Sequence, residues 1–297
     1  MSNHIFWLAS YPKSGNTLLR SILISLFFTE DGNFNLKLIT KISQFETDNL
    51  IYRNKNIFKN DFSKINDIST FYKYILQLQE KQVLKIDTDF QFFKTHSGNF
   101  IIGDSYFTKK ENIRGLIYII RDPRDVCVSW SKHMKSSIDD TIKFMTNTSQ
   151  TLYWGNEKET IFDEKDKPLR VLSSWDKHVT SWTTQSWDVP SMVIRYEDLV
   201  FDKKNTVFRI VEFFSKNFNF KFKNIEKKIE NILLTTQFEK FQKQEKKYGF
   251  AEAPRGNKFF SVGKSEQWLN KLSKNQVKKI ENAFKETMDL YNYKIIS

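Results

Sequence analysis

A lysine, a glycine and two hydroxyl side chains lie in a short segment whose spacing suits phosphate chemistry. Residues 11–17 read YPKSGNT and follow the apolar run of residues 4–10. A strand, a short loop and the first turn of a helix bind phosphate well, because free N–H groups and the helix dipole attract an anion. In NTP-binding loops of the pattern G-x-x-x-x-G-K-[ST], the lysine follows the last glycine. Lys13 precedes Gly15 here, so the segment indicates phosphate binding without nucleotide hydrolysis; the alternative is a plain turn before a helix.

A guanidinium and a hydroxyl group are spaced to share a second phosphate. The segment YIIRDPRDVCVSWSKH, residues 118–133, joins an apolar run to a helix that Asp122-Pro123 would start. Arg121 follows the apolar run directly, and Ser129 lies eight residues further on, within that helix. Arginine pairs with phosphate through parallel hydrogen bonds, and a nearby hydroxyl can add another. An Arg–Asp pair at the surface is the alternative interpretation.

Together with four other segments, these stretches resemble the sulfotransferase family that uses 3′-phosphoadenosine 5′-phosphosulfate (PAPS). In family order the segments are YPKSGNT (11–17), KTH (94–96), RDPRDVCVS (121–129), RYEDL (195–199), TQFEKF (236–241) and VGKSEQW (262–268). Each segment alone is unspecific, but six in order over nearly the whole chain are specific. The resemblance implies a PAPS-dependent sulfotransferase. The alternatives are a catalytically inactive PAPS-binding relative, a P-loop kinase or a basic nucleic-acid-binding protein.

The resemblance implies a role for each matching residue. The donor nucleotide would be held by Lys13, Ser14, Gly15, Asn16, Thr17, Leu18, Arg121, Ser129, Tyr196, Thr236, Phe238 and Gly263. His96 would act as general base on a hydroxyl or amine of the acceptor, and Lys13 would neutralise charge on the leaving phosphate. Lys94 would help to hold the sulfuryl oxygens, and Ser129 would interact with Lys13. Transfer would be in line and would require no metal.

The C-terminal segment lacks the cations that the family places before its glycine. Ser261 and Val262 stand where relatives have Arg and Lys, so part of the grip on the 3′-phosphate is missing. Arg255 lies in a Pro-Arg-Gly turn shortly before this segment and could fold back. We expect Arg255 to supply the missing cation, with Lys258 and Lys264 as alternatives.

Other departures concern adenine stacking and dimer formation. Leu18 stands where family members commonly have an aromatic residue that stacks on adenine, and Glu266 replaces the second glycine of the C-terminal loop. The dimerisation pattern Lys-x-x-x-Thr-Val-x-x-x-Glu of some relatives is absent. That dimer is therefore not expected, and the oligomeric state stays open.

Composition limits the class of protein. Of the 297 residues, 39% are hydrophobic, which is enough for a large core. The net charge of +12 favours anionic partners such as phosphorylated cofactors, acidic substrates, nucleic acid or membranes, although a Lys-rich surface would carry the same charge. Cys127 is the only cysteine, so no intrachain disulfide can form, and we expect it to be buried. No signal peptide or membrane-spanning stretch is evident. We therefore expect a soluble, cytoplasmic protein without nucleic-acid or membrane partners.

The apolar patterns predict the elements that position these residues. Strands are predicted over 4–10, 91–95, 115–120 and 191–195, and helices over 15–28, 69–81, 122–135, 168–184 and 205–216, with a last helix from a capping box at Ser273 and Gln276. Residues 30–66 are expected to form short helices and loops, and the polar residues 137–167 a mobile excursion. This alternation predicts an α/β, P-loop-like three-layer fold in one domain, 1–297, with helices on both faces of a mostly parallel sheet. Ligands of such sheets bind at the carboxyl ends of the strands.

The remaining histidines and the acceptor carry less information. His4, His133 and His178 lack a matching motif, and we expect them to be structural. The acceptor could be a small molecule or a glycan, since the aromatic residues suit either. Three segments would line its entrance: residues 30–90, 137–167 and 240–260.

Overall fold

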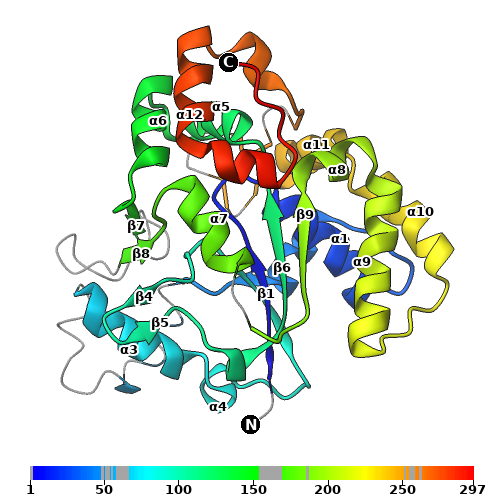
Figure 1. Cartoon of the computed structure of the whole chain (residues 1–297). Coiled ribbons are helices and arrows are strands. Elements are labelled where there is room, and N and C mark those ends of the chain that lie inside the picture. The colour runs from blue at the N-terminus through cyan, green and yellow to red at the C-terminus, as the bar shows by residue number, and fades with distance from the viewer. Residues whose placement is uncertain are drawn as a thin grey trace. The chain divides into compact units, whose positions relative to one another are not determined.

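The chain forms two compact units, which are described one at a time. The computed structural model describes residues 3–47, 50, 54, 56–57, 67–153, 169–184, 187–250, 252–253, 258–260 and 263–297. The first unit comprises Met1–Tyr11, Gln44–Tyr118 and Lys143–Ser191, and the second comprises Pro12–Ser43, Ile119–Ile142 and Met192–Ser297. Figure 1 labels their helices and strands. That the chain works as a single domain stays a prediction.

The described elements alternate between strands and helices along most of the chain. In chain order they are β1 (Ile5–Ala9), α1 (Asn16–Phe28), η1 (Leu36–Lys41), β2 (Ser43–Gln44), α3 (Ile68–Leu78), α4 (Lys81–Leu84), β3 (Gln91–Thr95), β4 (Ile101–Ile102), β5 (Ser105–Tyr106), η3 (Lys110–Asn112), β6 (Ile113–Ile120), α5 (Pro123–Met134), α6 (Ile138–Thr146), β7 (Thr151–Tyr153), β8 (Leu169–Val171), α7 (Trp175–Thr183), β9 (Ser191–Arg195), α8 (Tyr196–Phe201), α9 (Lys203–Phe218), α10 (Ile225–Thr235), α11 (Phe238–Tyr248), η5 (Gln267–Asn270) and α12 (Lys274–Leu290).

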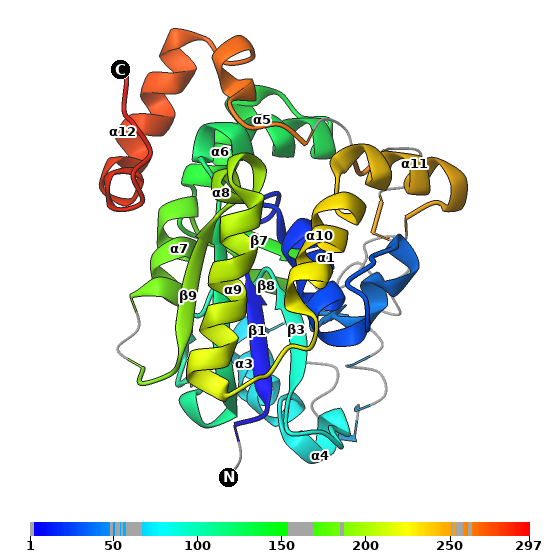
Figure 2. The ribbon, with the colours of Figure 1, turned by 90° about the vertical axis from the view of Figure 1, so that its right-hand side faces the viewer.

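A five-stranded sheet with the order β2-β3-β1-β6-β9 is the central feature of the fold. Strand β1 runs parallel to β3 (Figure 2) and to β6 (Figure 1). Its last residue, Ala9, is paired with Thr95 on one side and with Tyr118 on the other. All five residues of β1 are buried, as expected for an inner strand of a parallel sheet. The predicted α/β class with a mostly parallel sheet is confirmed. The carboxyl ends of β1 and β3 therefore lie next to each other in the first unit.

The core of the first unit is built around Trp7, which is fully buried. Its ring centroid lies 5.2 Å from that of Phe45, 5.4 Å from that of Phe107 and 6.2 Å from that of Trp182. Its indole N–H donates to Thr108 Oγ1 over 3.2 Å, so the polar end of the ring is satisfied although it is buried. This aromatic packing holds β1 in place, and through Phe93 it also holds β3, the strand that precedes His96.

Two sequence-based predictions of local structure are wrong. The described part of 137–167 is not a mobile excursion, because it contains helix α6 and strand β7. The helix is amphipathic: Ile142 and Met145 are buried among polar neighbours in the sequence. Residues 168–184 are not one helix either, because their first part forms β8, which pairs antiparallel with β7. Ser173 has a φ of 61°, a left-handed backbone conformation. It separates the extended strand β8 from helix α7, which starts at Trp175.

In the second unit, helix α1 is held along its length by the helices that follow it. Helices α9 and α10 pack side by side, and α10 also contacts α1 (Figure 2). The ammonium group of Lys228 on α10 donates to the carbonyl oxygens of Leu26 and Thr29, which satisfies carbonyls at the end of α1. Buried Arg20 donates from the middle of α1 to the carbonyl oxygens of Ile39 and Ile42.

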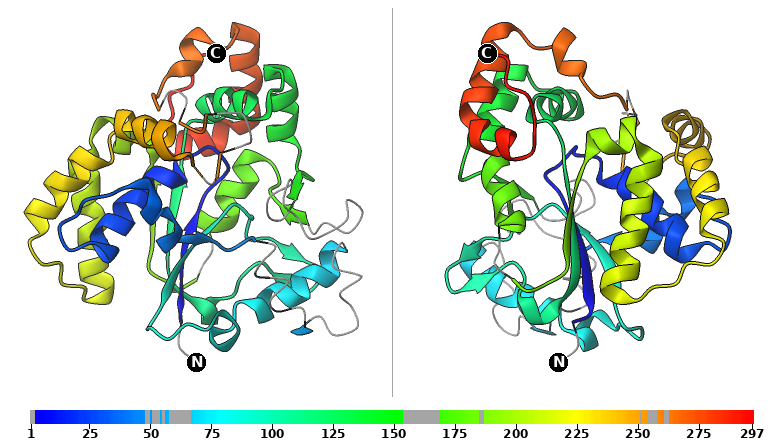
Figure 3. Two further views of the ribbon diagram at one scale, coloured as in Figure 1. Left: turned by 180° about the vertical axis from the view of Figure 1, so that it is seen from behind. Right: turned by 45° about the vertical axis from the view of Figure 1, so that its right-hand side comes forward.

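Helix α12 packs against α5 near the end of the chain (Figure 3). Its start is the predicted capping box: Ser273 accepts from Gln276 N, and the Gln276 side chain accepts from Ser273 N. Trp268 and Val277 pack against Val128 of α5, so the C-terminal segment is attached to the helix that follows Arg121. No helix within the described residues has the length and hydrophobicity needed to cross a membrane.

Candidate active site

The loop between β1 and α1 has the backbone of an anion-binding turn. Gly15 precedes the first helical residue with a φ of 98°, a left-handed conformation that favours glycine. Among the described residues, no side chain forms a capping hydrogen bond at this end of the helix. A Cβ atom at this position would lie 2.3 Å from a ring carbon of Tyr196, so the close approach also requires glycine. The hydroxyl of Ser14 is buried and has no hydrogen-bond partner among the described residues. Lys13 has a φ of 67°, and its ammonium nitrogen lies 4.5 Å from the ring centroid of Phe259.

Arg121, directly after β6, connects this loop to the C-terminal loop of residues 263–268. Its Nη1 donates to the carbonyl oxygen of Lys13 over 3.1 Å, and its Nη2 donates to that of Lys264 over 3.0 Å. The guanidinium carbon lies 4.3 Å from the ring centroid of Tyr196, and Nη2 lies 3.5 Å from a carboxylate oxygen of Asp125. The buried Nε has no partner in the described part of the chain. The residue predicted to bind the 3′-phosphate therefore also orders the two loops around it.

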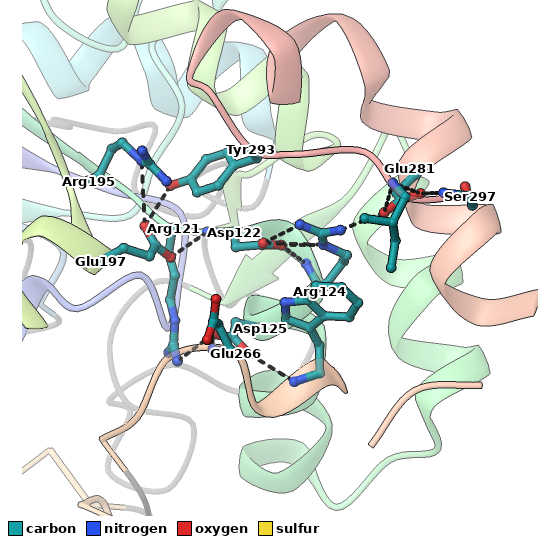
Figure 4. Close-up of polar contacts among 12 residues, drawn as sticks. Arg121, Asp122, Arg124, Asp125, Arg195, Glu197, Glu266, Glu281, Tyr293 and Ser297 are labelled. Atoms are coloured by element: carbon teal, nitrogen blue, oxygen red, sulfur yellow. Dashed lines mark hydrogen bonds and ion pairs between the residues drawn. The ribbon is translucent and has the colours of Figure 1, made fainter. Parts of the chain in front are cut away.

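Asp125 on α5 anchors the C-terminal loop (Figure 4). Its two carboxylate oxygens accept hydrogen bonds from Glu266 N over 2.8 Å and from Trp268 N over 3.2 Å. Burial raises the pKa of this carboxyl group, and the nearby Arg121 guanidinium opposes that shift. Glu266 has a φ of 62°, so the position where the family has glycine keeps a left-handed backbone despite the substitution. Glutamate in place of glycine therefore adds backbone strain without removing the turn.

The first glycine of the C-terminal loop is retained because an aromatic ring lies against it. Gly263 has a φ of 64°, and an added Cβ would lie 2.1 Å from a ring carbon of Phe238. Phe238 begins helix α11 and its ring centroid lies 6.1 Å from that of Phe260. The structure thus brings together the predicted adenine residue Phe238 and the predicted loop residue Gly263.

Buried ion pairs support the segment that carries Arg121 (Figure 4). Arg124 is bonded to Asp122 through Nη2 over 2.6 Å and to Glu281 of α12 through Nη1 over 2.5 Å. Glu281 also accepts from the backbone N–H of Ser297 over 2.8 Å. Each buried charge is therefore paired, which is the condition for tolerating it.

A second carboxylate joins the same segment to the C-terminal tail. Glu197 of α8 accepts from Asp122 N over 3.1 Å and from the Tyr293 hydroxyl over 3.0 Å (Figure 4). Burial raises the pKa of Glu197, and the hydrogen bond from Asp122 N lowers it. The sequence does not reveal this support, because its members come from three segments that are far apart along the chain.

The remaining residues predicted to bind the nucleotide differ in how far they are buried within the second unit. Tyr196 is buried beside Gly15, and Thr236 is buried with its hydroxyl donating to the carbonyl oxygen of Ile232 over 2.7 Å. Ser129 is half-buried on α5. Asn16 and Thr17 are buried in the first turn of α1, and Leu18 is half-buried. Arg255, Ser261 and Val262 lie outside the described residues.

In the first unit, His96 follows strand β3 and is held in one tautomer. Its Nδ1 lies 2.8 Å from the carbonyl oxygen of Ser10. A carbonyl can only accept, so Nδ1 carries the proton and Nε2 carries the lone pair. Desolvation by burial, followed by the positive charge of Lys94, holds the pKa of His96 well below its usual 6.5. The ring is therefore neutral at physiological pH, with a basic nitrogen available.

Three residues that belong to no recognisable sequence motif support His96. Buried His178 donates from Nε2 to the carbonyl oxygen of His96 over 3.0 Å, and the Tyr118 hydroxyl donates to its Nδ1 over 2.9 Å. Burial lowers the pKa of His178 to about 4. Glu46 accepts from His96 N over 3.1 Å and from Ser97 N over 3.0 Å. His178 was expected to be structural, and its contacts agree; no signal in the sequence points to Glu46.

An α/β sheet whose first strand leads through a glycine loop into a helix is typical of proteins that bind phosphorylated ligands. A family model described as "Sulfotransferase domain" matches residues 4–292. The chain therefore belongs to the sulfotransferase domain family, a family of enzymes.

Two hydroxysteroid sulfotransferases are similar to part of this chain. A 3-alpha-hydroxysteroid sulfotransferase of Cavia porcellus is 26% identical over 221 residues, which cover 73% of this chain and 69% of that protein. A 3-beta-hydroxysteroid sulfotransferase of the same species is 23% identical over 223 residues, covering 72% and 69%.

Solved structures with the same fold cover nearly the whole chain. The crystal structure of mouse sulfotransferase SULT7A1 complexed with PAP has a TM-score of 0.58 at 17% identity and covers 97% of this chain and 86% of that one. Retinol dehydratase in complex with androsterone and inactive cofactor PAP has a TM-score of 0.59 at 18% identity, covering 97% and 81%. At these identities the likeness shows the fold alone.

Proposed function

We propose that this protein transfers a sulfuryl group from PAPS to a hydroxyl or amine of a small-molecule acceptor. The observation that carries the proposal is the gathering of Lys13, Ser14, Gly15 and Arg121 at the amino end of α1. Donors and cations predominate there, and an anion would supply the missing acceptors. The two structural neighbours named above are complexes with PAP. The family model spans both compact units, which supports a single functional domain over 1–297.

The residues present fit a doubly phosphorylated nucleotide. The Ser14 hydroxyl and the Arg121 Nε are buried donors without partners among the described residues. The 5′-phosphate would be held by residues 13–17, the 3′-phosphate by Arg121 and Ser129, and the adenine by Tyr196, Thr236, Phe238 and Leu18. Arg255, outside the described residues, would complete the 3′-phosphate site beside Gly263. When bound, PAPS supplies the sulfuryl group and the phosphate that leaves.

The protein's part in the chemistry is a proton acceptor and two cations. His96 would take the acceptor's proton on Nε2, because Nδ1 is already committed to the carbonyl of Ser10. A positioned general base typically contributes roughly 10²–10⁴-fold. Lys13 follows Ser10 by three residues in the chain and would stabilise charge on the departing phosphate. Lys94, buried in β3 shortly before His96, would hold the sulfuryl oxygens, and Ser129 would contact Lys13.

The acceptor is proposed to be a small-molecule alcohol rather than a glycan. Two relatives are hydroxysteroid sulfotransferases, and structures of retinol dehydratase hold androsterone or retinol. These compounds carry one hydroxyl on a large apolar body.

The test is transfer from radiolabelled PAPS, in the presence of EDTA, to a panel of steroid alcohols, retinol, a simple phenol and an oligosaccharide. We expect label on at least one alcohol, and roughly 10²–10³-fold slower labelling with Lys13→Ala. Adenosine 3′,5′-bisphosphate (PAP) should stabilise the protein by about 2.7 kcal/mol at a hundredfold excess over its Kd. PAP binding without transfer to any acceptor would indicate an inactive relative. Stabilisation by ATP but not by PAP would contradict the proposal and favour a kinase.

A further inference from the structure

A single buried carboxylate oxygen collects the donors of the turn that carries His96. Glu46 is 1% exposed, and its Oε1 accepts from His96 N over 3.1 Å, from Ser97 N over 3.0 Å and from Ser97 Oγ over 2.9 Å. The hydroxyl of Thr95 also donates to the same oxygen. Four donors on one oxygen explain how an acidic side chain is tolerated at this depth. They also mean that one atom determines the path of three consecutive residues.

The opposite side of the turn is held as well. His178 Nε2 donates to the carbonyl oxygen of His96, and Trp182 Nε1 donates to that of Ser97 over 2.9 Å. The peptide groups on both sides of His96 are therefore fixed by side chains from α7 and by Glu46. What remains free is rotation of the imidazole ring, and the hydrogen bond from Nδ1 to Ser10 ends it.

We propose that Glu46 is a positioning residue for the general base: through Oε1 it fixes the 95–97 turn, so that Nδ1–H of His96 meets Ser10 and Nε2 faces the acceptor. The proposal rests on the proposed sulfuryl transfer for its kinetic consequences. Its structural core, the tautomer and orientation of His96, does not depend on any reaction. A displacement of a catalytic group by about 1 Å can cost on the order of 100-fold in rate, so such support has a large effect.

The second oxygen of Glu46 separates a role of position from a role of charge. Oε2 is buried and has no hydrogen-bond partner among the described residues. In Glu46→Gln the amide would keep a carbonyl-type acceptor in place of Oε1, lose the charge and place an NH₂ group at the buried Oε2 position. This variant should preserve the turn at some cost in stability. Glu46→Asp keeps the charge but shortens the side chain by one methylene, which withdraws the acceptor from its four donors. If Glu46 acts by positioning the turn, Glu46→Gln should be tolerated and Glu46→Asp should not. If it acts through its negative charge, Glu46→Asp should be tolerated and Glu46→Gln should not.

The experiment compares wild type, Glu46→Gln, Glu46→Asp and Glu46→Ala by two measurements. The first is the tautomer of His96 in the nucleotide-free protein, read from proton–nitrogen NMR correlations of the ring and assigned with His96→Ala. Wild type and Glu46→Gln should show the proton on Nδ1. Glu46→Asp and Glu46→Ala should show a mixture of the two tautomers. This measurement stands even if the protein transfers no sulfuryl group, so failure of the proposed function is seen separately.

The second measurement is steady-state kinetics with PAPS and the best acceptor. Glu46→Asp and Glu46→Ala should lose roughly 10-fold to 100-fold in kcat with the KM for PAPS unchanged, and Glu46→Gln should restore most of kcat. If Glu46→Ala does not fold, the Asp and Gln pair decides the question, since both keep a polar side chain. An unchanged tautomer and kcat in Glu46→Asp, or equal losses in Glu46→Gln and Glu46→Asp, would overturn the proposal.

Discussion

The loop around Lys13 and the turn around His96 both follow strands of the sheet, but their polar groups are satisfied in opposite ways. Beside Lys13, the hydroxyl of Ser14 and the Nε of Arg121 are buried donors without partners in the described chain. At the turn, the donors of residues 95–97 converge on Glu46. Leaving buried donors unpaired costs free energy, so the loop is suited to receive an anion. The turn is complete by itself and presents one lone pair.

The comparison is tested most strongly by removing the functional group from each region. His96→Ala should lower kcat by roughly 10²–10⁴-fold and leave the Kd of PAP near the wild-type value, because a general base contributes to the chemical step. Lys13→Ala should lower kcat by roughly 10²–10³-fold and also weaken the binding of PAPS, since a fixed cation acts on both. Steady-state kinetics and calorimetric titration with PAP measure the two quantities.

Matched substitutions control for general damage. His133→Ala removes a histidine of α5 whose ring lies tilted beside Trp130, with the ring centroids 5.7 Å apart. Lys37→Ala removes a lysine that lies over Tyr248 much as Lys13 lies over Phe259. Both should keep wild-type kcat. The activity of the wild type should fall only below pH 6.5, because protonation of Nε2 abolishes the base and the pKa of His96 is lowered. A His96→Ala enzyme with wild-type kcat would remove His96 from the mechanism.

The two regions also differ in how far the sequence predicts them. The loop and Arg121 lie in contiguous motifs between an apolar run and a helix, so their types and spacing are visible without a structure. Glu46 is 50 residues from the turn that it holds, inside a segment predicted only as short helices and loops. Pairing across such a separation depends on the register of the sheet and on aromatic packing, which no local pattern reports. The strand β8 is missed for the same reason, because its partner β7 is distant in the sequence.

Local patterns succeed where burial and capping act within one segment. Strands β1, β3, β6 and β9 are apolar runs, and α12 begins at a capping box, so all five are predicted close to their observed bounds. Helices α10 and α11 are not predicted, because lysine and glutamate dominate 225–248 and obscure the few buried positions, such as Ile229, Ile232 and Phe241. In that range tertiary contacts decide the structure more than the pattern does.

The pH dependence of the unfolding free energy should show that His178, which supports the His96 turn, is buried and neutral. His178 is neutral when folded, with a pKa of about 4 against 6.5 for the free side chain. The unfolded chain then binds more protons, so His178 alone should lower the free energy of unfolding by about 3 kcal/mol as the pH falls from 6.5 to about 4. His96, whose pKa is also lowered, should add to this decrease. His178→Gln cannot titrate, and its unfolding free energy should fall less over this interval. Denaturant titrations at several pH values measure the difference, and parallel curves would contradict the buried neutral state.

The smallest expected effect concerns Asp125, which holds the C-terminal loop of residues 263–268 through two hydrogen bonds. In Asp125→Asn one of the two loop N–H groups, of Glu266 or Trp268, would face an amide NH₂ instead of an acceptor, and Arg121 would lose its charged neighbour. Removing a negative charge favours a phosphate, but an unpaired buried N–H costs about 1–3 kcal/mol and displaces the loop next to Arg121, so we expect the loss to prevail. The affinity for PAP should fall about tenfold, while that for adenosine 5′-phosphate, which lacks the 3′ group, should change little. Asp139→Asn, which removes an exposed partner of Lys279, is the matched control and should bind both ligands as wild type does. Tighter binding of PAP by Asp125→Asn would mean that the charge of Asp125, and not its hold on the loop, governs the 3′-phosphate site.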